Sequence, residues 1–327
     1  MVRNNTTGGV PMSRNLELKR LYRMLGRILC VLCLGWGGTF LAEAQDALPV
    51  RPPVGQAMLA ADTLPLVAHR TDTVPVCRVG WPAAFRRVQA SVLIDHLGVL
   101  HPFWEKLRLM RLGSDSDTVR VVHVGDSHVR GHIFPDTVGA LLREVFPRLS
   151  YRDFGINGAF CFTFTRDDRV KAIAAMKPDL LILSFGTNES HNYRYNTDAH
   201  YRQMDELVRM LREYLPDTPI LMTTPPGSYE RLGRGRRRTY RINPRTEAAA
   251  RTIVRYADAN GLAVWDLYNT AGGASRACLN WQEAGLMRPD HVHYLPAGYA
   301  LQGRLLCEAL LKAYNDYVEY GYNRNLP

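Results

Sequence analysis

The residues best suited to chemistry in this sequence are a serine, an aspartate and a histidine, in that order along the chain. Ser127 stands in "VGDSH", directly after an apolar run, and Asp290 and His293 stand three residues apart in "DHVHYLPAGY". On a turn, a carboxylate at that spacing can accept a hydrogen bond from Nδ1 of the imidazole, which leaves Nε2 free to deprotonate a serine. His291 is an alternative base, but the i, i+3 pair is better oriented. The pattern predicts a nucleophilic serine with a base and an orienting carboxylate.

Two further clusters contain groups that could stabilise the oxyanion of such a reaction. Gly158 ends "GING", where glycine lets the backbone approach a substrate and offer its N–H. Asn188 lies in "FGTNES", after an apolar run, where its side-chain N–H could point at the same oxygen. Each cluster alone has a structural explanation, since serine and asparagine are common helix caps and Asn-Gly is a common turn. Their occurrence together favours the catalytic interpretation.

These clusters need a scaffold that brings them to one edge, and the hydrophobic pattern predicts an α/β fold with a five-stranded parallel sheet. Nearly continuous apolar runs, typical of strands buried on both faces, alternate with segments of helical periodicity. The predicted strands lie at 119–125, from 149, and at 179–186, 219–224 and 262–268, and the predicted helices at 133–146, 168–177, 201–215, 244–259 and 296–320. Sites in such sheets lie at the carboxyl ends of the strands. Three clusters follow strands and the fourth lies in the last loop.

The first 81 residues differ in composition from the rest and predict export. Basic residues up to Arg27 precede the apolar stretch "ILCVLCLGWGGTFLA", and "AEA" at 42–44 fits a signal cleavage site. We interpret 1–44 as a signal peptide, with an uncleaved signal anchor as the alternative, and expect a bacterial periplasmic or cell-surface protein. Residues 45–81 hold five prolines without sustained periodicity, which indicates a tether. Residues 82–112 have a helical pattern and predict one or two helices packed on a domain that spans 82–327.

Net charge and cysteine content limit the partners and cofactors. The formal net charge is +10, and six basic and two acidic residues among the first 44 contribute +4 of it. The remaining net charge of +6 is too small to indicate nucleic-acid binding by itself. An oxidising compartment allows disulfides among Cys77, Cys161, Cys278 and Cys307, with buried free thiols as the alternative. These four cysteines form no CxxC pair and no Cys/His spacing that indicates a metal site, and we expect no cofactor.

Taken together, the four clusters resemble those of the SGNH (GDSL-like) hydrolase family. "VGDSH" matches the nucleophile block, "GINGA" the second block, "GTNE" the third and "DHVHYLPAGY" the last. His128 replaces the leucine of the GDSL name, and Tyr294 replaces the usual leucine after the histidine. The resemblance covers roughly residues 118–312 and is nearest to exported bacterial members, among which peptidoglycan O-acetylesterases occur.

The resemblance implies a three-layer α/β/α, flavodoxin-like fold and a two-step ester hydrolysis. In that mechanism Ser127 attacks the acyl carbon, His293 takes its proton and Asp290 orients the imidazole. The amides of Ser127 and Gly158 and the side chain of Asn188 hold the oxyanion. The expected activity is that of a serine esterase acting on carbohydrate O-acetyl groups.

Residues around the predicted site bear on its substrate. We expect His128, Arg130, Tyr193 and Tyr229 at a substrate rim. The stretch "ERLGRGRRRTYRINPR" holds seven arginines between 231 and 245. A solvated loop is one interpretation of this stretch, and an anion-binding lip for acidic polymers is the other. An acyltransferase, a lysophospholipase or thioesterase, and a non-catalytic polyanion-binding module are the competing functions, and membrane contact is expected only through an uncleaved N-terminal segment.

Overall fold

The computed structural model describes residues 72–76, 78–114, 117–233 and 235–321, all within one compact unit. The predicted signal segment 1–44, residues 45–71 of the predicted tether and Cys77 lie outside the described residues. Among the described helices, none is both long enough and apolar enough to cross a membrane.

Five parallel strands form the central sheet, as predicted. They are β1 (Val119–Gly125), β2 (Leu149–Gly155), β3 (Leu180–Ser184), β4 (Ile220–Thr223) and β7 (Ala263–Trp265), in the order β2-β1-β3-β4-β7. From β1 the chain first adds β2 on one side and then crosses to add β3 on the other. The carboxyl ends of β1 and β3 therefore meet at a topological switch point, where open α/β sheets bind their ligands.

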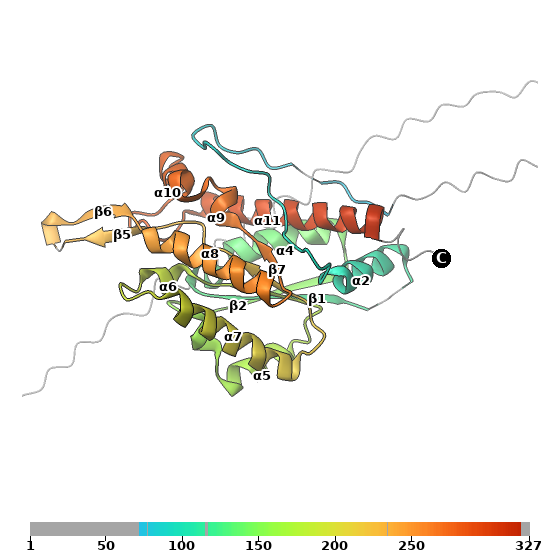
Figure 1. Ribbon diagram of the computed structural model, residues 1–327. Coiled ribbons are helices and arrows are strands. Elements are labelled where there is room, and N and C mark those ends of the chain that lie inside the picture. The colour runs from blue at the N-terminus through green and yellow to red at the C-terminus, as the bar shows by residue number, and fades with distance from the viewer. Residues whose placement is uncertain (1–71, 77, 115–116, 234, 322–327) are drawn as a thin grey trace, which may run out of the picture. The chain divides into compact units, whose positions relative to one another are not determined.

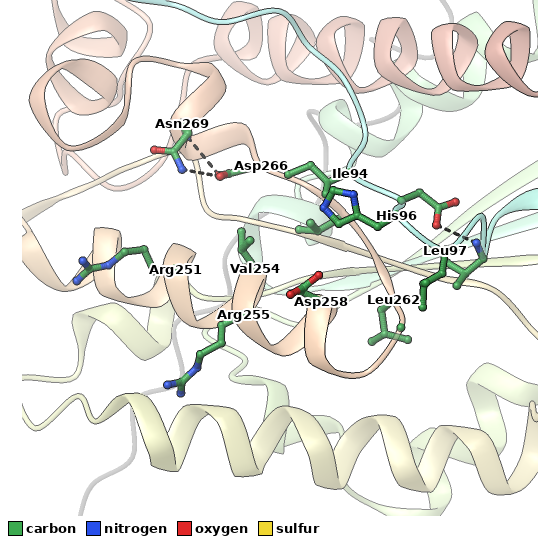
Figure 2. Close-up of a pocket in the computed structure, with 14 residues that line it drawn as sticks. Ile94, His96, Leu97, Arg251, Val254, Arg255, Asp258, Leu262, Asp266 and Asn269 are labelled. Carbon is green, nitrogen blue, oxygen red and sulfur yellow. Dashed lines mark hydrogen bonds between the residues drawn. The ribbon is translucent and has the colours of Figure 1, made fainter.

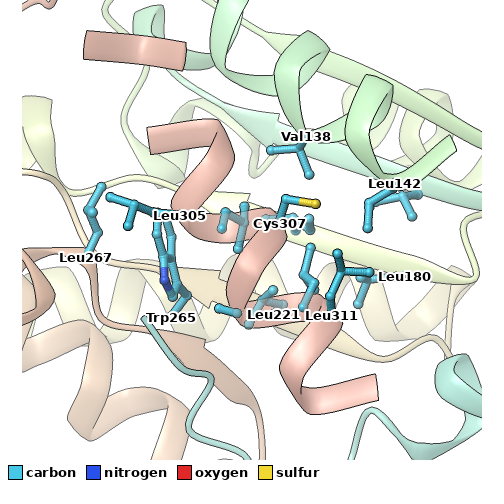
Figure 3. Packing of buried hydrophobic residues seen from close by; sticks show 14 of the residues in the cluster. Val138, Leu142, Leu180, Leu221, Trp265, Leu267, Leu305, Cys307 and Leu311 are labelled. Atoms are coloured by element: carbon cyan, nitrogen blue, oxygen red, sulfur yellow. The ribbon is translucent and has the colours of Figure 1, made fainter. Parts of the chain in front are cut away.

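Helices cover both faces of the sheet and complete three layers (Figure 1). One face carries α2 (His101–Leu112), α4 (Ile133–Val145) and α11 (Pro296–Asp316), and the other carries α5 (Asp167–Ala175), α7 (Thr197–Tyr214) and α8 (Pro244–Ala259). Alternate strand residues supply the two cores. Figure 3 shows Leu221 and Trp265 gathered with Leu305 of α11, whereas Leu183 packs with the residues of α7 and α8. The predicted α/β/α class is confirmed.

The long helices form where the periodicity predicts them, and their caps explain where they begin. The side chain of Asn196 accepts a hydrogen bond from the Ala199 amide before α7, and the side chain of Asn243 accepts one from the Arg245 amide before α8. Both caps satisfy first-turn amides that have no partner inside the helix. Two helices that follow β7 were not predicted, α9 (Leu267–Thr270) and α10 (Gly273–Glu283).

The region before β1 contains α2, as expected of the one or two helices predicted over 82–112. An edge pairing before this helix was not predicted: Ile94 exchanges two backbone hydrogen bonds of 2.9 Å with Val264 at the open edge of β7. This pairing satisfies edge groups that would otherwise lack partners. The tether prediction is wrong for the described part of 72–81, because Val74 is buried and exchanges two hydrogen bonds with Asn315 of α11.

The arginine-rich stretch is not the simple loop that we considered. It forms an antiparallel hairpin of β5 (Tyr229–Leu232) and β6 (Thr239–Ile242), which projects beyond the end of α8 (Figure 1). Gly233 and Gly235 adopt positive φ in the connection. Short runs of alternating polar and apolar residues on both sides of such glycines are typical of a hairpin. We had interpreted this stretch by its arginines alone.

Candidate active site

Ser127 lies at the carboxyl end of β1, on the first turn of the short helix α3 (Ser127–Arg130). Serine is a common helix cap, but the cap here is Asp126, whose side chain accepts a hydrogen bond from the His128 amide at 2.9 Å. Ser127 therefore occupies the first helical position, and its hydroxyl is not used to cap the helix. Its amide has no acceptor within the helix, which leaves that N–H available to a ligand.

Two facing glycines make room for this turn. Gly125 at the end of β1 pairs with Gly155 at the end of β2. A Cβ on Gly125 would lie 2.6 Å from the Ser184 carbonyl oxygen, and one on Gly155 would lie 2.2 Å from the Arg130 nitrogen. Backbone atoms at these distances cannot give way cheaply, so only glycine lets α3 lie against the ends of both strands.

The structure brings Ser127, His293 and Asp290 into one hydrogen-bonded chain. Ser127 Oγ is 2.9 Å from His293 Nε2, and His293 Nδ1 is 3.0 Å from Asp290 Oδ2. Asp290 Oδ1 accepts hydrogen bonds of 2.9 Å from the amides of Val292 and His293.

The protonation state of Asp290 determines the direction of these bonds. Partial burial disfavours its charge, but the hydrogen bonds from the His293 and Val292 amides and from the imidazole outweigh burial and hold the pKa of Asp290 below its usual value. An ionised carboxylate only accepts, so Nδ1 of His293 carries the proton. Nε2 then accepts from the Ser127 hydroxyl, which is the arrangement needed to activate a serine.

The groups predicted to stabilise the oxyanion lie around the same edge of the sheet, but they differ in whether they already have hydrogen-bond partners. Gly158 is exposed, with φ of +70°, in the loop after β2. Asn188, in α6 (Thr187–His191), donates both hydrogens of Nδ2, one to the Ala159 carbonyl at 2.9 Å and one to Asp126 Oδ2 at 3.2 Å. An oxyanion would therefore have to compete for an Asn188 hydrogen.

Asp126 is the weaker of the two competitors. Burial, together with the nearby charge of Glu189, raises the pKa of Asp126 to about 8. The hydrogen bond from Asn188 to Asp126, at 3.2 Å, is also longer than the bond of 2.9 Å to the Ala159 carbonyl. The Asn188 hydrogen that points to Asp126 is thus the one that a charged oxyanion could take.

The four predicted rim residues occupy different environments. His128 is buried, so its placement at the rim is wrong: its ring lies 5.3 Å from the His293 ring, and Nδ1 is 3.0 Å from the Tyr299 hydroxyl. Arg130 and Tyr193 are exposed. Tyr229 is largely buried, but it lines a cavity of about 440 Å³ that Asp290 also lines.

His291, the alternative base, has a structural role beside the site. Its backbone is in the left-handed region, with φ of +57°. Its carbonyl accepts from the Tyr229 amide at 2.9 Å, and its ring centroid lies 4.1 Å from that of Tyr240 on β6. His291 thus joins the hairpin to the loop that carries Asp290 and His293. Sequence reasoning missed this connection and the cavity residues His191, Arg238 and Tyr240.

One buried group among the described residues has the side chains of a metal site. Ligand atoms of Cys161, Glu189 and His200 lie within 4.8 Å of one another. The Glu189 carboxylate already accepts from the amides of Cys161 at 2.7 Å and Gly186 at 2.8 Å. These bonds tie the loop after β2 to the turn after β3, a structural role that requires no metal. Cys161, Cys278 and Cys307 are buried, and the structure has no disulfide among these three.

A second cavity, of about 490 Å³, lies apart from these residues. Figure 2 shows it between α8 and the 94–99 segment, with Val254, Asp258 and Leu262 among the residues that line it. The triad side chains do not line it. The cavity beside Asp290 is therefore the one relevant to chemistry at Ser127.

The fold and this site together are those of an α/β ester hydrolase. A profile of the GDSL-like Lipase/Acylhydrolase family matches residues 123–301, more than half of the chain. The chain belongs to this family, and the resemblance to SGNH hydrolases is confirmed. Comparison with curated protein sequences finds no match.

Several solved structures are similar to this chain at low sequence identity. A peptidoglycan O-acetylesterase is 18% identical and superposes with a TM-score of 0.60, covering 68% of this chain and 99% of its own. A GDSL-like lipase from Bacteroides thetaiotaomicron is 19% identical, with a TM-score of 0.43 over 65% of this chain and 99% of its own. An acetyl xylan esterase is 18% identical, with a TM-score of 0.44 over 60% and 99%.

Proposed function

We propose that this ester hydrolase is an exported serine esterase that removes acetyl groups from a carbohydrate. The observation that carries the proposal is the hydrogen-bonded chain of Ser127, His293 and Asp290 at the carboxyl edge of the sheet. Nucleophile, base and orienting carboxylate each have a partner that fits their role.

The reaction proceeds in two steps. Ser127 Oγ attacks the acyl carbon as His293 Nε2 takes its proton, and His293 then gives that proton to the leaving sugar oxygen. Water, deprotonated by the same nitrogen, attacks the acyl-enzyme, and His293 returns that proton to Ser127 Oγ as the Oγ–acyl bond breaks and acetate leaves. The amides of Ser127 and Gly158 and the Asn188 side chain stabilise the oxyanion in both steps.

The openness of the site supports hydrolysis over acyl transfer. The side chains of His293 and Asp290 are 31% and 48% exposed, and Ser127 is half-buried. Water therefore reaches the acyl-enzyme, whereas a transferase must exclude it.

The cavity beside the triad supports a polar substrate. Arginine, tyrosine and histidine side chains line it, with few aliphatic groups. A lysophospholipase or a long-chain thioesterase needs an apolar channel for the acyl chain. The solved peptidoglycan O-acetylesterase has the same fold, which is compatible with a glycan substrate. We include anionic polymers among the partners, because seven arginines lie between 231 and 245.

Export is proposed from the N-terminal sequence, where basic residues, a 15-residue apolar stretch and "AEA" follow one another. Fractionation of the native cells tests it, and recovery of the full-length chain in the cytosol alone would contradict it.

The esterase proposal is tested by Ser127→Ala. We expect the variant to lose hydrolysis of p-nitrophenyl acetate by roughly 10³-fold or more, because the nucleophile is removed. It should also lose labelling by a fluorophosphonate probe, whereas circular dichroism stays that of the unaltered protein. Full activity in the variant would overturn the assignment, and an unaltered protein that neither labels nor hydrolyses would favour a binding module.

A further inference from the structure

One face of the β5–β6 hairpin forms one wall of the cavity beside Asp290, and His191 and the loop of residues 289–292 form the rest. Side chains two residues apart on a strand share a face, and so do directly paired residues on neighbouring strands. Tyr229 and Arg231 are two apart on β5, and Arg231 pairs with Tyr240 on β6. Arg238 lies two residues before Tyr240 and also lines the cavity. Two arginines and two tyrosines therefore face the same space.

On the opposite face of the hairpin, the arginines are paired with a carboxylate. Glu230 pairs with Arg241 across the two strands and forms ion pairs with both Arg241 and Arg245. Glu230 is the one acidic residue between 230 and 245. Within the described part of the chain, no ion pair is recorded for Arg231 or Arg238, so the cavity face keeps its positive charge.

The hairpin is fixed to the loop that carries the triad. The Tyr229 amide donates to the His291 carbonyl at 2.9 Å, and the His291 ring packs against Tyr240. Asp290 lies at the boundary between the cavity and the triad. A molecule in the cavity would therefore lie directly beside the ester at Ser127.

We propose that this cavity is a subsite for a carboxylate-bearing sugar that neighbours the acetylated sugar in an acidic glycan. The proposal rests on the esterase function above and names its substrate class. The guanidinium groups of Arg231 and Arg238 bind the carboxylate, since the planar fork of arginine matches its two oxygens. Tyr229 and Tyr240 form an aromatic wall for the sugar ring. The volume of about 440 Å³ is within the range of small-ligand sites.

Asp290 also lines the cavity and opposes an anion there. Its carboxylate, however, accepts hydrogen bonds from the Val292 and His293 amides and from the His293 ring. These donors offset much of its field, and the two arginines outnumber it. The net field in the cavity is therefore positive.

A matched pair of substrates tests the subsite. One is an O-acetylated oligosaccharide with a uronic acid next to the acetylated sugar, and the other is the same oligosaccharide with its carboxyl group reduced to an alcohol. We expect the unaltered protein to have kcat/KM about tenfold or more higher on the acidic member, the effect of one or two charge-assisted hydrogen bonds. Arg231→Ala and Arg238→Ala should each lower this ratio about tenfold, mainly through KM.

Arg237→Ala is the control, because it removes the same charge from an exposed position on the same hairpin that does not line the cavity. It should change the ratio less than about twofold, a change too small for a lost charge-assisted hydrogen bond. An equal loss in this variant, or equal rates of the unaltered protein on both substrates, would overturn the subsite.

A third substrate with a phosphate ester in place of the carboxylate separates the two anions, and preference for it would overturn the carboxylate assignment. If neither oligosaccharide nor p-nitrophenyl acetate is deacetylated, the esterase function itself fails. Equal deacetylation of both oligosaccharides removes only the subsite.

Discussion

Asp290 has two functions that a single substitution can separate. Oδ2 holds the His293 ring through Nδ1, and Oδ1 accepts the amides of Val292 and His293 that shape the loop. An asparagine in the same position keeps an oxygen for the amides but loses the charge that selects the Nδ1–H tautomer. The chemistry should therefore suffer far more than the fold.

We expect Asp290→Asn to lower kcat on p-nitrophenyl acetate by about 10³- to 10⁴-fold, with KM little changed, because His293 then presents the wrong tautomer to Ser127. Steady-state kinetics measure this effect. Asp136→Asn, at an exposed position in the first turn of α4, is the control and should retain full activity. A kcat for Asp290→Asn close to that of the control would exclude the assigned role.

At the scale of elements, α3 is positioned by the ends of two strands rather than by its own stability. A four-residue helix cannot be stable alone, so its place depends on the close contact of Arg130 with Gly155. Any added Cβ on Gly155 meets backbone atoms and must displace the helix that carries Ser127.

Gly155→Ala should lower both Tm and kcat. Overpacking of about 1–3 kcal/mol corresponds to a fall of several degrees in a domain of this size. Differential scanning fluorimetry and p-nitrophenyl acetate kinetics measure the two effects. Gly131→Ala is the matched control, because its Cβ would lie 3.5 Å from the nearest atom and its φ is −69°. Identical behaviour of the two variants would show that the contact does not position α3.

At the scale of the whole molecule, buried histidines make stability depend on pH. His123 lies at the centre of β1, with Nε2 2.6 Å from Ser184 Oγ and Nδ1 2.9 Å from the Tyr151 hydroxyl. Burial lowers the pKa of His123 and of His128 to about 3, and the charge of His293 adds to the effect at His128. Both rings stay neutral in the folded chain at pH values where they bind protons in the unfolded chain.

Below pH 6.5 the unfolded state binds more protons than the folded state, so the free energy of unfolding falls as pH falls from about 6.5 towards 3. Each buried histidine contributes up to about 1.4 kcal/mol per pH unit in this window. Urea denaturation at several pH values between 7.5 and 4.5 measures how the free energy of unfolding depends on pH. In His123→Gln this free energy should fall less steeply with pH than in the unaltered protein, by the equivalent of about one bound proton. His96→Gln, at an exposed position, should keep the original slope. Equal slopes in all three proteins would contradict the prediction.

The sequence alone determined the α/β class, the five strands and the residues Ser127, Asp290 and His293, because these depend on local properties. Strand and helix periodicity is written within each segment, and the carboxyl ends of parallel strands meet wherever such a sheet forms. The i, i+3 spacing of Asp290 and His293 is likewise local, and the structure finds the two side chains in contact.

Only the tertiary structure decided what surrounds the triad, because those contacts join residues far apart in the chain. His128 is buried by Tyr299, 171 positions away, and Asn188 donates to Asp126 across 62 positions. The arginine stretch became a cavity wall because His291 binds the hairpin to the catalytic loop. No local pattern records such pairings, so the sequence could place Ser127, Asp290 and His293 but not the side chains that surround them.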